Sequence, residues 1–234
     1  MTKNQIKFDG FSQKVRDFFI ELKTNNNKEW FDAHKDFYTN EIKDVSKLLV
    51  AEMSEFFISG GLPFIADPKI SLFRINRDIR FSANKDPYKT NMGVFFPFSK
   101  HPLSNRNVDK PGLYFHLDDT ETFIAGGIHC PMPDTLKKTR ERIAEDNQEL
   151  NRIVNDSSFL SEFSSTLHGD ILKKVPRGFP QDHPAAELLK MKEYLVSCEL
   201  SFKDSNSRKL LELIQRKAIA IAPFLEYFYD AIYE

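Results

Sequence analysis

The residues best suited to chemistry in this chain lie between positions 74 and 90, in the stretch R-I-N-R-D-I-R-F-S-A-N-K-D-P-Y-K-T. Arginine offers a planar fork of donors and lysine a mobile point charge, so such a cluster can hold a carboxylate or a phosphate. The two acids of the stretch, Asp78 and Asp86, cannot neutralise its five cations by themselves. The stretch therefore predicts a site for a small anionic ligand, with these candidate residues: Arg74, Arg77, Arg80, Lys85, Tyr88 and Lys89.

Two other interpretations of this stretch remain open. Acids within it and elsewhere can pair with the arginines and make it a structural salt-bridge network. The same basic loop, with Phe81 and Tyr88, can also serve a non-enzymatic module that binds nucleic acid or a protein partner. A concave pocket would favour the ligand site, a flat basic stripe would favour the module, and fully paired arginines would favour the network.

A second stretch with chemical potential is P-R-G-F-P-Q-D-H-P, at positions 176–184. Such a stiff loop can lie over a pocket, where Arg177 would add a second basic wall and His183 would move a proton near neutral pH. We take His183 and Tyr88 as the candidate catalytic residues. The alternative is a rigid connector in which His183 bonds its own loop.

The sequence predicts no metal site and names no cofactor. His116-Leu117-Asp118, with His168 and Arg177 downstream, resembles the facial triad of iron oxygenases, but that chemistry sits in a jelly roll and this chain is helix-rich. The pair His129-Cys130 lacks the additional ligands of a zinc site. Neither a dinucleotide-binding glycine motif nor a P-loop is present.

Bulk composition limits the partners of the chain. Its 234 residues are 41% hydrophobic and 29% charged, with a net charge of −1. This balance indicates neither disorder nor a general attraction to nucleic acid or membranes, so any anion binding must be local. No signal segment and no run of about 18 apolar residues is present, and we expect a soluble, cytoplasmic protein without a membrane partner.

Hydrophobic periodicity predicts the elements that must position these residues. A pair of long helices is expected over 11–59, a strand-rich region over 69–130, and helices over 133–234 with one possible strand at 195–202. The runs 113–117 and 122–129 predict an antiparallel hairpin that turns at Asp118 to Thr120. We therefore expect a single α+β domain over 1–234, with a mainly antiparallel sheet of about 4 to 6 strands.

The expected strand that begins at Ile70 creates a conflict at Arg77. On a strand, Arg77 would share a face with apolar Phe73 and Ile75. Either the strand bulges near Asn76, or Arg77 enters the interior and is paired there, because an isolated buried charge is very costly. Further along, Gly126 and Gly127 can either present backbone N–H groups to an anion or permit close packing at a strand end.

Four motifs in order resemble a known family. R-D-I-R-F-S-x-x-K-x-P-Y-K-T-N, at positions 77–91, resembles the signature of a widespread bacterial group known as domain of unknown function 2461. The stretches N-N-K-E-W-F at 26–31, G-G-x-x-x-P at 126–131 and P-R-G-F-P-x-D-H-P at 176–184 fit the same pattern. The resemblance covers nearly the whole chain and implies no activity, because the family is named for lacking one. Ala83 and Asn84 replace the family's usual lysine and aspartate, which favours Arg77, Arg80, Lys85, Tyr88 and Lys89 instead.

Overall fold

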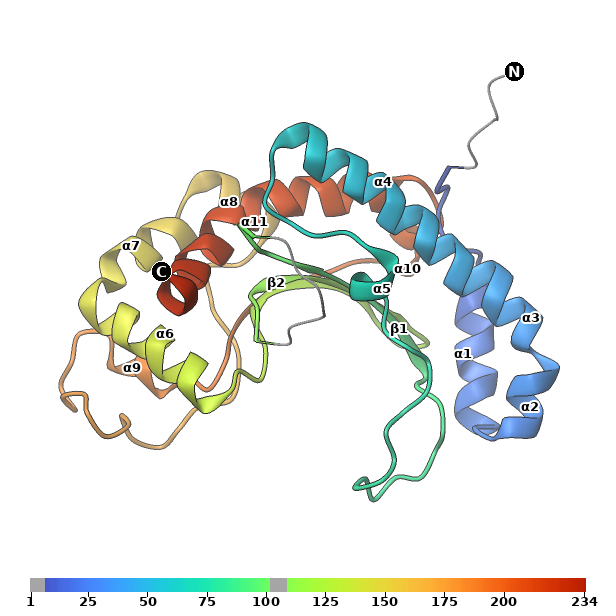
Figure 1. The fold of residues 1–234 in the computed structure, drawn as a ribbon, viewed down its shortest axis with the longest axis horizontal. Helices are drawn as coiled ribbons and strands as arrows, with labels where there is room; N and C mark the ends of the chain where they lie inside the picture. The colour runs from blue at the N-terminus through green and yellow to red at the C-terminus, as the bar shows by residue number, and fades with distance from the viewer. Residues whose placement is uncertain (1–6, 102–108) are drawn as a thin grey trace.

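The centre of the protein is a four-stranded antiparallel sheet, seen in a computed structural model that describes residues 7–101 and 109–234 (Figure 1). The strands follow one another in the order β1-β2-β3-β4, and neighbours in that order are hydrogen-bonded. The predicted hairpin is confirmed: β2 pairs with β3, and Asp118 N donates to Glu121 O at 3.1 Å across the turn. The strands are β1 (Asn91–Pro97), β2 (Gly112–Asp118), β3 (Thr122–Ile128) and β4 (Tyr194–Glu199).

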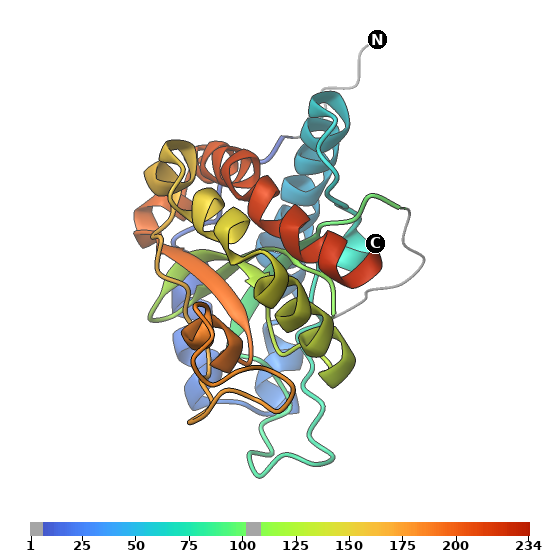
Figure 2. The same cartoon turned by 90° about the vertical axis from the view of Figure 1, so that its left-hand side faces the viewer.

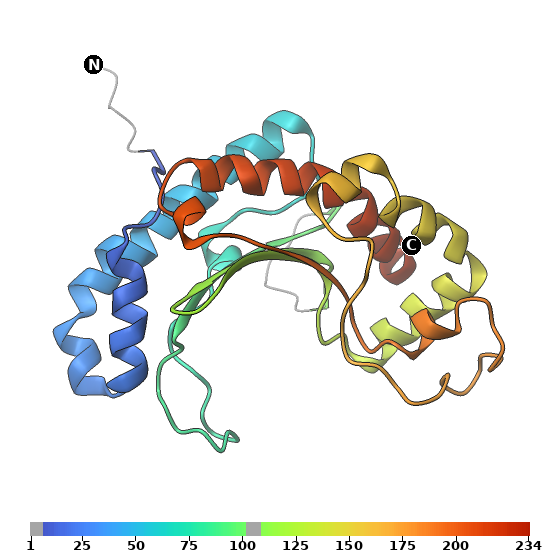
Figure 3. The same ribbon diagram turned by 180° about the vertical axis from the view of Figure 1, so that it is seen from behind.

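Helices pack on one face of this sheet and at its two ends. Figures 1 and 3 show α4 and α11 across one face, with α1 to α3 at one end and α6, α7 and α9 at the other. The α+β class predicted from the sequence is therefore confirmed. The helices are α1 (Lys14–Thr24), α2 (Lys28–Ala33), α3 (Lys35–Phe37), the π-helix η1 (Tyr38–Lys43), α4 (Asp44–Gly60), α5 (Pro68–Ser71), α6 (Pro133–Glu145), α7 (Asn147–Val154), α8 (Ser157–Glu162), α9 (Ala186–Lys190), α10 (Phe202–Ser205) and α11 (Lys209–Tyr233).

The side chains of the sheet alternate between a buried face and a partly exposed face, as a pleated strand requires. The buried face packs against α11 and α4, and its core includes Phe96, Phe115 and Val196. On the opposite face the side chains of Tyr114 and Phe123 keep part of their surface exposed. We call this second face the open face of the sheet.

The sequence prediction was wrong for the segment that precedes β1. Asp67 caps a short helical turn, since its side chain accepts from Lys69 N at 2.7 Å and Pro68 occupies the first helical position. Ile70 therefore lies in α5 and not in a strand. The chain from 72 to 90 forms isolated bridges only, so the strand-rich region begins at β1.

The second N-terminal helix also differs from the expected single element. It is divided into α2, α3, η1 and α4, and the division begins where α2 ends at Ala33. His34, which follows, has a φ of −109°, and its ring stacks on Trp30 at 3.9 Å. The apolar periodicity continues through the interruption, which is why the pattern predicts one helix.

Extended backbone borders both outer edges of the sheet. Beside β1, Ile65 N donates to Pro97 O at 2.9 Å, and Phe73 N donates to Gly93 O at 3.4 Å. Beside β4, His168 N donates to Leu195 O at 2.8 Å and Leu195 N donates back at 3.1 Å. Among the described residues, no helix combines the length and apolar character that a bilayer crossing needs.

Candidate functional site

The candidate basic residues lie on a hairpin that projects from the sheet on the side away from α4 and α11 (Figures 1 and 2). We call residues 72–90 the basic hairpin. Asn76 and Tyr88 form an isolated bridge, and Arg77 N donates to Pro87 O at 2.9 Å. Lys89 N also donates to Ile75 O at 2.8 Å. The tip, residues 78–86, lies beyond these backbone contacts between the two arms.

The base of the basic hairpin is fastened to the N-terminal helices. The ring of Tyr88 is 7% exposed and stacks on Phe31 with ring centres 4.1 Å apart. The side-chain amide of Asn26 accepts from Tyr88 N and donates to Tyr88 O, each at 3.0 Å. The motifs at 26–31 and 77–91 therefore meet at Tyr88. This residue anchors the hairpin to the N-terminal helices, and its catalytic role stays a prediction.

Two of the predicted cations have partners within the tip. Arg80 contacts both oxygens of Asp78, at 2.9 and 2.7 Å. This hydrogen bonding lowers the pKa of Asp78. Lys85 Nζ donates to Ile79 O at 3.0 Å. These contacts are those expected of a structural network.

Arg77 is half-buried, with 27% of its side chain exposed. Its Nη1 donates to Asp86 O at 3.4 Å and lies 4.0 Å from Asp86 Oδ2, and its Nη2 lies 3.5 Å from Ser82 Oγ. The conflict foreseen for Arg77 on a strand is thus avoided, because the backbone here is a loop and the guanidinium is paired inside it.

Arg74 and Lys89 lie on the two arms, nearer to the sheet. Arg74 is exposed, and Lys89 is half-buried with Nζ 5.0 Å from the centre of the Phe73 ring. Phe73 in turn meets Tyr114 of β2 edge to face, with ring centres 5.9 Å apart. Through Phe73, Lys89 therefore brings positive charge next to the open face of the sheet.

The second predicted loop lies apart from the basic hairpin, although both are on the same side of the sheet (Figures 1 and 2). Arg177 is exposed, and the half-buried His183 accepts from Ala185 N through Nδ1 at 3.0 Å. This bond is the one expected of a rigid connector. In the described parts of the chain, no hydrogen bond or ion pair joins the two loops, so their cooperation stays a prediction.

The open face of the sheet carries a polar chain on β2. Tyr114 OH lies 3.0 Å from His116 Nδ1, and Asn91 Nδ2 lies 3.3 Å from the same nitrogen. Both groups can donate, so Nδ1 is the acceptor and Nε2 carries the proton. Nε2 faces Asp118 Oδ2 at 3.3 Å, and the ring stacks on Phe123 at 4.7 Å. The result is an ordered Tyr-His-Asp chain beside the arms of the basic hairpin.

The surroundings shift the pKa values of Tyr114 and Asp118. Burial raises the pKa of Tyr114 to about 12, against a smaller effect of Asn91. For Asp118, burial alone would raise the pKa, but hydrogen bonds from Glu121 and Thr120 N–H groups and the contact with His116 together lower it. Nε2 of His116 is buried and its contact with Asp118 is poorly directed for a hydrogen bond. A buried donor with unused capacity requires an explanation.

The facial-triad arrangement considered from the sequence does not assemble around His116. His168 contacts Ser197 Oγ on β4 through Nε2 at 3.0 Å. The His168 backbone pairs with Leu195 on the outer edge of β4, and β3 lies between β4 and β2. With strands about 4.8 Å apart, the His168 backbone is therefore three strand spacings from β2, which carries His116. Asp118 and Glu121 are the carboxylates that approach His116.

The paired glycines are explained by close packing. Gly127 has a φ of 132°, and a Cβ there would lie 1.9 Å from Tyr194 O. A Cβ on Gly126 would lie 2.2 Å from Ile221 Cδ1 of α11. Both glycines lie within β3, paired to β2 and β4, so the packing alternative accounts for them.

A cavity of about 400 Å³ opens at the turn between β2 and β3. Among the described residues its charged lining is mostly acidic and includes Asp118, with Arg16 as the one cation. No residue of the basic hairpin lines it. The described lining residues are Arg16, Asp118, Asp119, Thr120, Glu121, Thr122, Glu199, Leu200 and Phe202.

Sequence reasoning missed the Tyr-His-Asp chain because it considered the H-x-D of β2 solely as a metal motif. The signal was present: Tyr114, His116 and Asp118 alternate with apolar residues, which places all three on one face of the predicted strand. Asn91 belongs to the signature motif, but its partner on β2 is distant in sequence.

Comparisons with known proteins give one match. No curated protein and no solved structure matches the chain. The model of a family described as conserved hypothetical protein (DUF2461) matches residues 14–227, which includes the basic hairpin, β2 and the second loop. The resemblance stated from the motifs is confirmed, and the chain belongs to the DUF2461 family.

Proposed function

We propose that the open face of the sheet around His116, with the arms of the basic hairpin beside it, binds a small ligand that carries a phosphate or carboxylate. The observation that carries this proposal is the buried Nε2 of His116, which an ordered polar chain holds in place but which has no well-directed partner among residues 7–101 and 109–234. Lys89, whose Nζ lies 5.0 Å from the centre of the Phe73 ring beside Tyr114, supports a positive charge at this place, and Arg74 on the other arm would add to it. Arg77, Arg80 and Lys85 brace the tip through their local contacts.

The chemistry available to this site is proton transfer. His116 would donate a hydrogen bond from Nε2–H to a ligand polar atom that comes within reach. When a second proton enters at Nδ1 and the Tyr114 hydroxyl turns to accept from it, the imidazolium, stabilised by Asp118, could pass its Nε2 proton to that atom and return to the neutral state. The neighbouring cation Lys89 would stabilise negative charge that develops on the ligand. Under this proposal the protein acts as an enzyme with His116 as its acid–base residue, and roles for Tyr88, Arg177 and His183 stay predictions.

The test is ligand binding by variants of the two arms. Inorganic phosphate, nucleoside monophosphates and dicarboxylates would be screened by thermal shift, and dissociation constants measured by calorimetry for those that bind. We expect the double variant R74A/K89A and the single variant H116Q each to weaken binding at least tenfold. The control K28A removes an exposed charge on α2 that pairs with Asp32 at 3.6 Å, and it should bind as the parent does.

Two outcomes would refute the proposal. One is that none of these probes binds the parent protein. The other is that binding is unchanged in both R74A/K89A and H116Q. Thermal unfolding of each variant without ligand separates a loss of binding from a loss of folding.

A second candidate function has its own observation. Phe81, at the tip of the basic hairpin, is 94% exposed, and the guanidinium of Arg80 lies 5.7 Å from its ring centre. An exposed ring beside cations is typical of surfaces that stack on single-stranded nucleic acid. A fluorescent single-stranded oligonucleotide should then bind less tightly as salt rises and lose affinity with F81S. The control I58S removes a 79% exposed side chain from α4 and should change nothing; equal affinities of F81S and the parent would exclude this function.

A further inference from the structure

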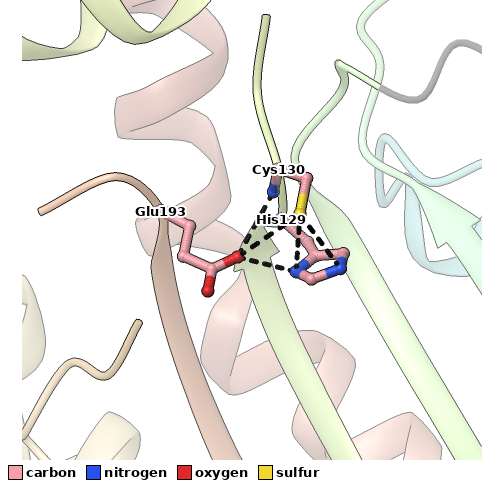
Figure 4. Close-up of side chains that lie close together, drawn as sticks. All are labelled: His129, Cys130 and Glu193. Atoms are coloured by element: carbon pink, nitrogen blue, oxygen red, sulfur yellow. Dashed lines mark hydrogen bonds and ion pairs between the residues drawn. The ribbon is translucent and has the colours of Figure 1, made fainter. Parts of the chain in front are cut away.

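A second cluster of reactive side chains lies at the other end of β3 (Figure 4). His129 and Cys130 follow β3 directly, and Glu193 precedes β4. Ile128 is paired with Tyr194, so the antiparallel register brings Glu193 beside the two residues. Sequence reasoning left His129-Cys130 without further ligands because Glu193 is 63 residues away from Cys130.

The donor atoms of this cluster face one another. His129 Nδ1 lies 2.7 Å from Glu193 Oε2, and Cys130 Sγ lies 3.8 Å from His129 Nδ1 and 3.9 Å from Glu193 Oε2. One nitrogen, one sulfur and one oxygen therefore occupy the corners of a small triangle. All three donor atoms lie within 4.8 Å of one another.

We propose that His129, Cys130 and Glu193 bind one divalent metal ion of the zinc class. Zn–N and Zn–O bonds of about 2.0–2.2 Å and a Zn–S bond of about 2.3 Å place tetrahedral ligands about 3.3–3.6 Å apart. The two distances to sulfur already approach this range. The nitrogen–oxygen distance must lengthen by about 0.6 Å, which is expected when a metal replaces the proton between the two atoms.

The choice of metal follows from the donor set. Thiolate and imidazole favour zinc over magnesium or calcium, which take oxygen ligands. Three protein ligands leave the fourth position of a tetrahedral ion for water or a substrate atom, as in catalytic zinc sites. The site is distinct from the His116 chain, whose donors are nitrogen and oxygen.

The surrounding backbone holds the cluster in this form. Glu193 Oε1 accepts from Asp170 N at 3.4 Å, and Gly169 permits this close approach because a Cβ there would lie 2.5 Å from Glu193 Cγ. Cys130 has a φ of 46°, which turns the chain directly after His129. Asp170 adds a second negative charge nearby, although it also contacts Lys192 at 3.3 Å.

The experiment uses the full chain, freed of metal by a chelator and then titrated with Co²⁺ under reducing conditions. We expect one equivalent to bind and to give the sulfur-to-cobalt charge-transfer absorption of a thiolate ligand. Competition with a chromophoric chelator gives the Zn²⁺ affinity. C130S should abolish the absorption and weaken Zn²⁺ at least tenfold, and H129A should weaken Zn²⁺ by a similar factor.

The second free cysteine supplies the matched control. Cys198 is half-buried on β4, and C198S should keep both the absorption and the affinity. Cobalt that binds without the charge-transfer absorption would point to His116, Asp118 and Glu121 and overturn the proposal. The absence of stoichiometric binding, or equal affinity in C130S and the parent, would overturn it as well. His129 is 73% exposed, so H129A tests the site even where C130S folds poorly.

Discussion

Lys217 is a charged residue in the interior, with 3% of its side chain exposed. Its Nζ donates to the backbone oxygen of Glu162 at 2.7 Å and lies 3.1 Å from Glu162 Oε2, and the ring of Phe163 lies 4.9 Å away. A buried ammonium is tolerated where such partners replace water. At this single residue, the end of α8 is tied to the middle of α11.

Removal of the Glu162 carboxylate alone should lower the free energy of unfolding more than removal of both charges of the Glu162–Lys217 pair. E162A leaves the ammonium buried with less compensation, and we expect the free energy of unfolding to fall by about 3 kcal/mol. The double variant E162Q/K217M should lose less than E162A, because no buried charge remains. Urea unfolding measures both.

The control for this comparison is a pair on the surface. Glu187 is 82% exposed and contacts Lys190 on α9. E187A should change the free energy of unfolding by no more than about 0.5 kcal/mol. Equal losses in E162A and E187A would show that the ammonium of Lys217 is adequately solvated without its partner.

At the scale of elements, β3 and β4 approach each other closely because one residue has no side chain. Gly127 has a positive φ and sits against the carbonyl of Tyr194. A side chain at this position would push β4 away from β3 and disturb the residues that follow both strands. The pairing of β3 with β4 thus depends on this glycine.

Gly127→Ala should lower the free energy of unfolding by about 3 kcal/mol, through backbone strain and overpacking together. Gly61 is the matched control, because its φ of 62° is also positive but nothing lies within 4 Å of an added Cβ. Gly61→Ala should cost about 1 kcal/mol, the strain of the left-handed conformation alone. Thermal or urea unfolding compares the two variants. Similar losses in the free energy of unfolding would mean that β4 shifts to accommodate the added methyl group without further destabilisation.

The elements were predictable wherever local patterns agreed with the final packing. The β2–β3 hairpin follows from alternating residues on both sides of Asp118 to Thr120, and α11 follows from its apolar period. The prediction of a strand at Ile70 was wrong because Asp67, as N-cap, and Pro68, at the first helical position, favour a helical turn over the strand propensity of that segment. The cluster of basic residues in the hairpin was visible in the sequence. Its contacts with Asn26 and Phe31 were not, because sequence spacing alone cannot position such distant segments.

At the scale of the whole molecule, three distant segments are joined at Glu52. Its Oε1 accepts from Phe8 N at 2.6 Å and from Arg208 Nη1 at 3.1 Å, and Arg208 also donates to Phe8 O at 2.9 Å. The segment before α1, the middle of α4 and the start of α11 thus share one polar contact. The hydrogen bonds from Arg208 lower the pKa of Glu52 below its usual 4.5, against the effect of burial.

The lowered pKa predicts a loss of stability in acid. A carboxyl with a depressed folded-state pKa stabilises the protein above its unfolded pKa and stops doing so as the pH falls through the lower folded value. E52Q should therefore be less stable than the parent by about 1 kcal/mol at pH 7. The difference should shrink progressively below about pH 4.5.

Urea unfolding at several pH values between 7 and 3 tests this dependence. E55Q, a change of the same kind on the exposed side of α4, should follow the parent at every pH. If the difference between E52Q and the parent stayed constant with pH, the carboxylate of Glu52 would not be the group that titrates.

The bordered edges of the sheet affect how the protein can associate with others. An open edge strand is a template on which a foreign strand can add, and it promotes aggregation. Here the backbone at Ile65 and Phe73 engages β1, and the backbone at His168 engages β4. Strand addition at these places must first displace a segment of the chain itself. A partner is therefore expected to meet side chains of the open face and the hairpin tip, and not the backbone of a strand.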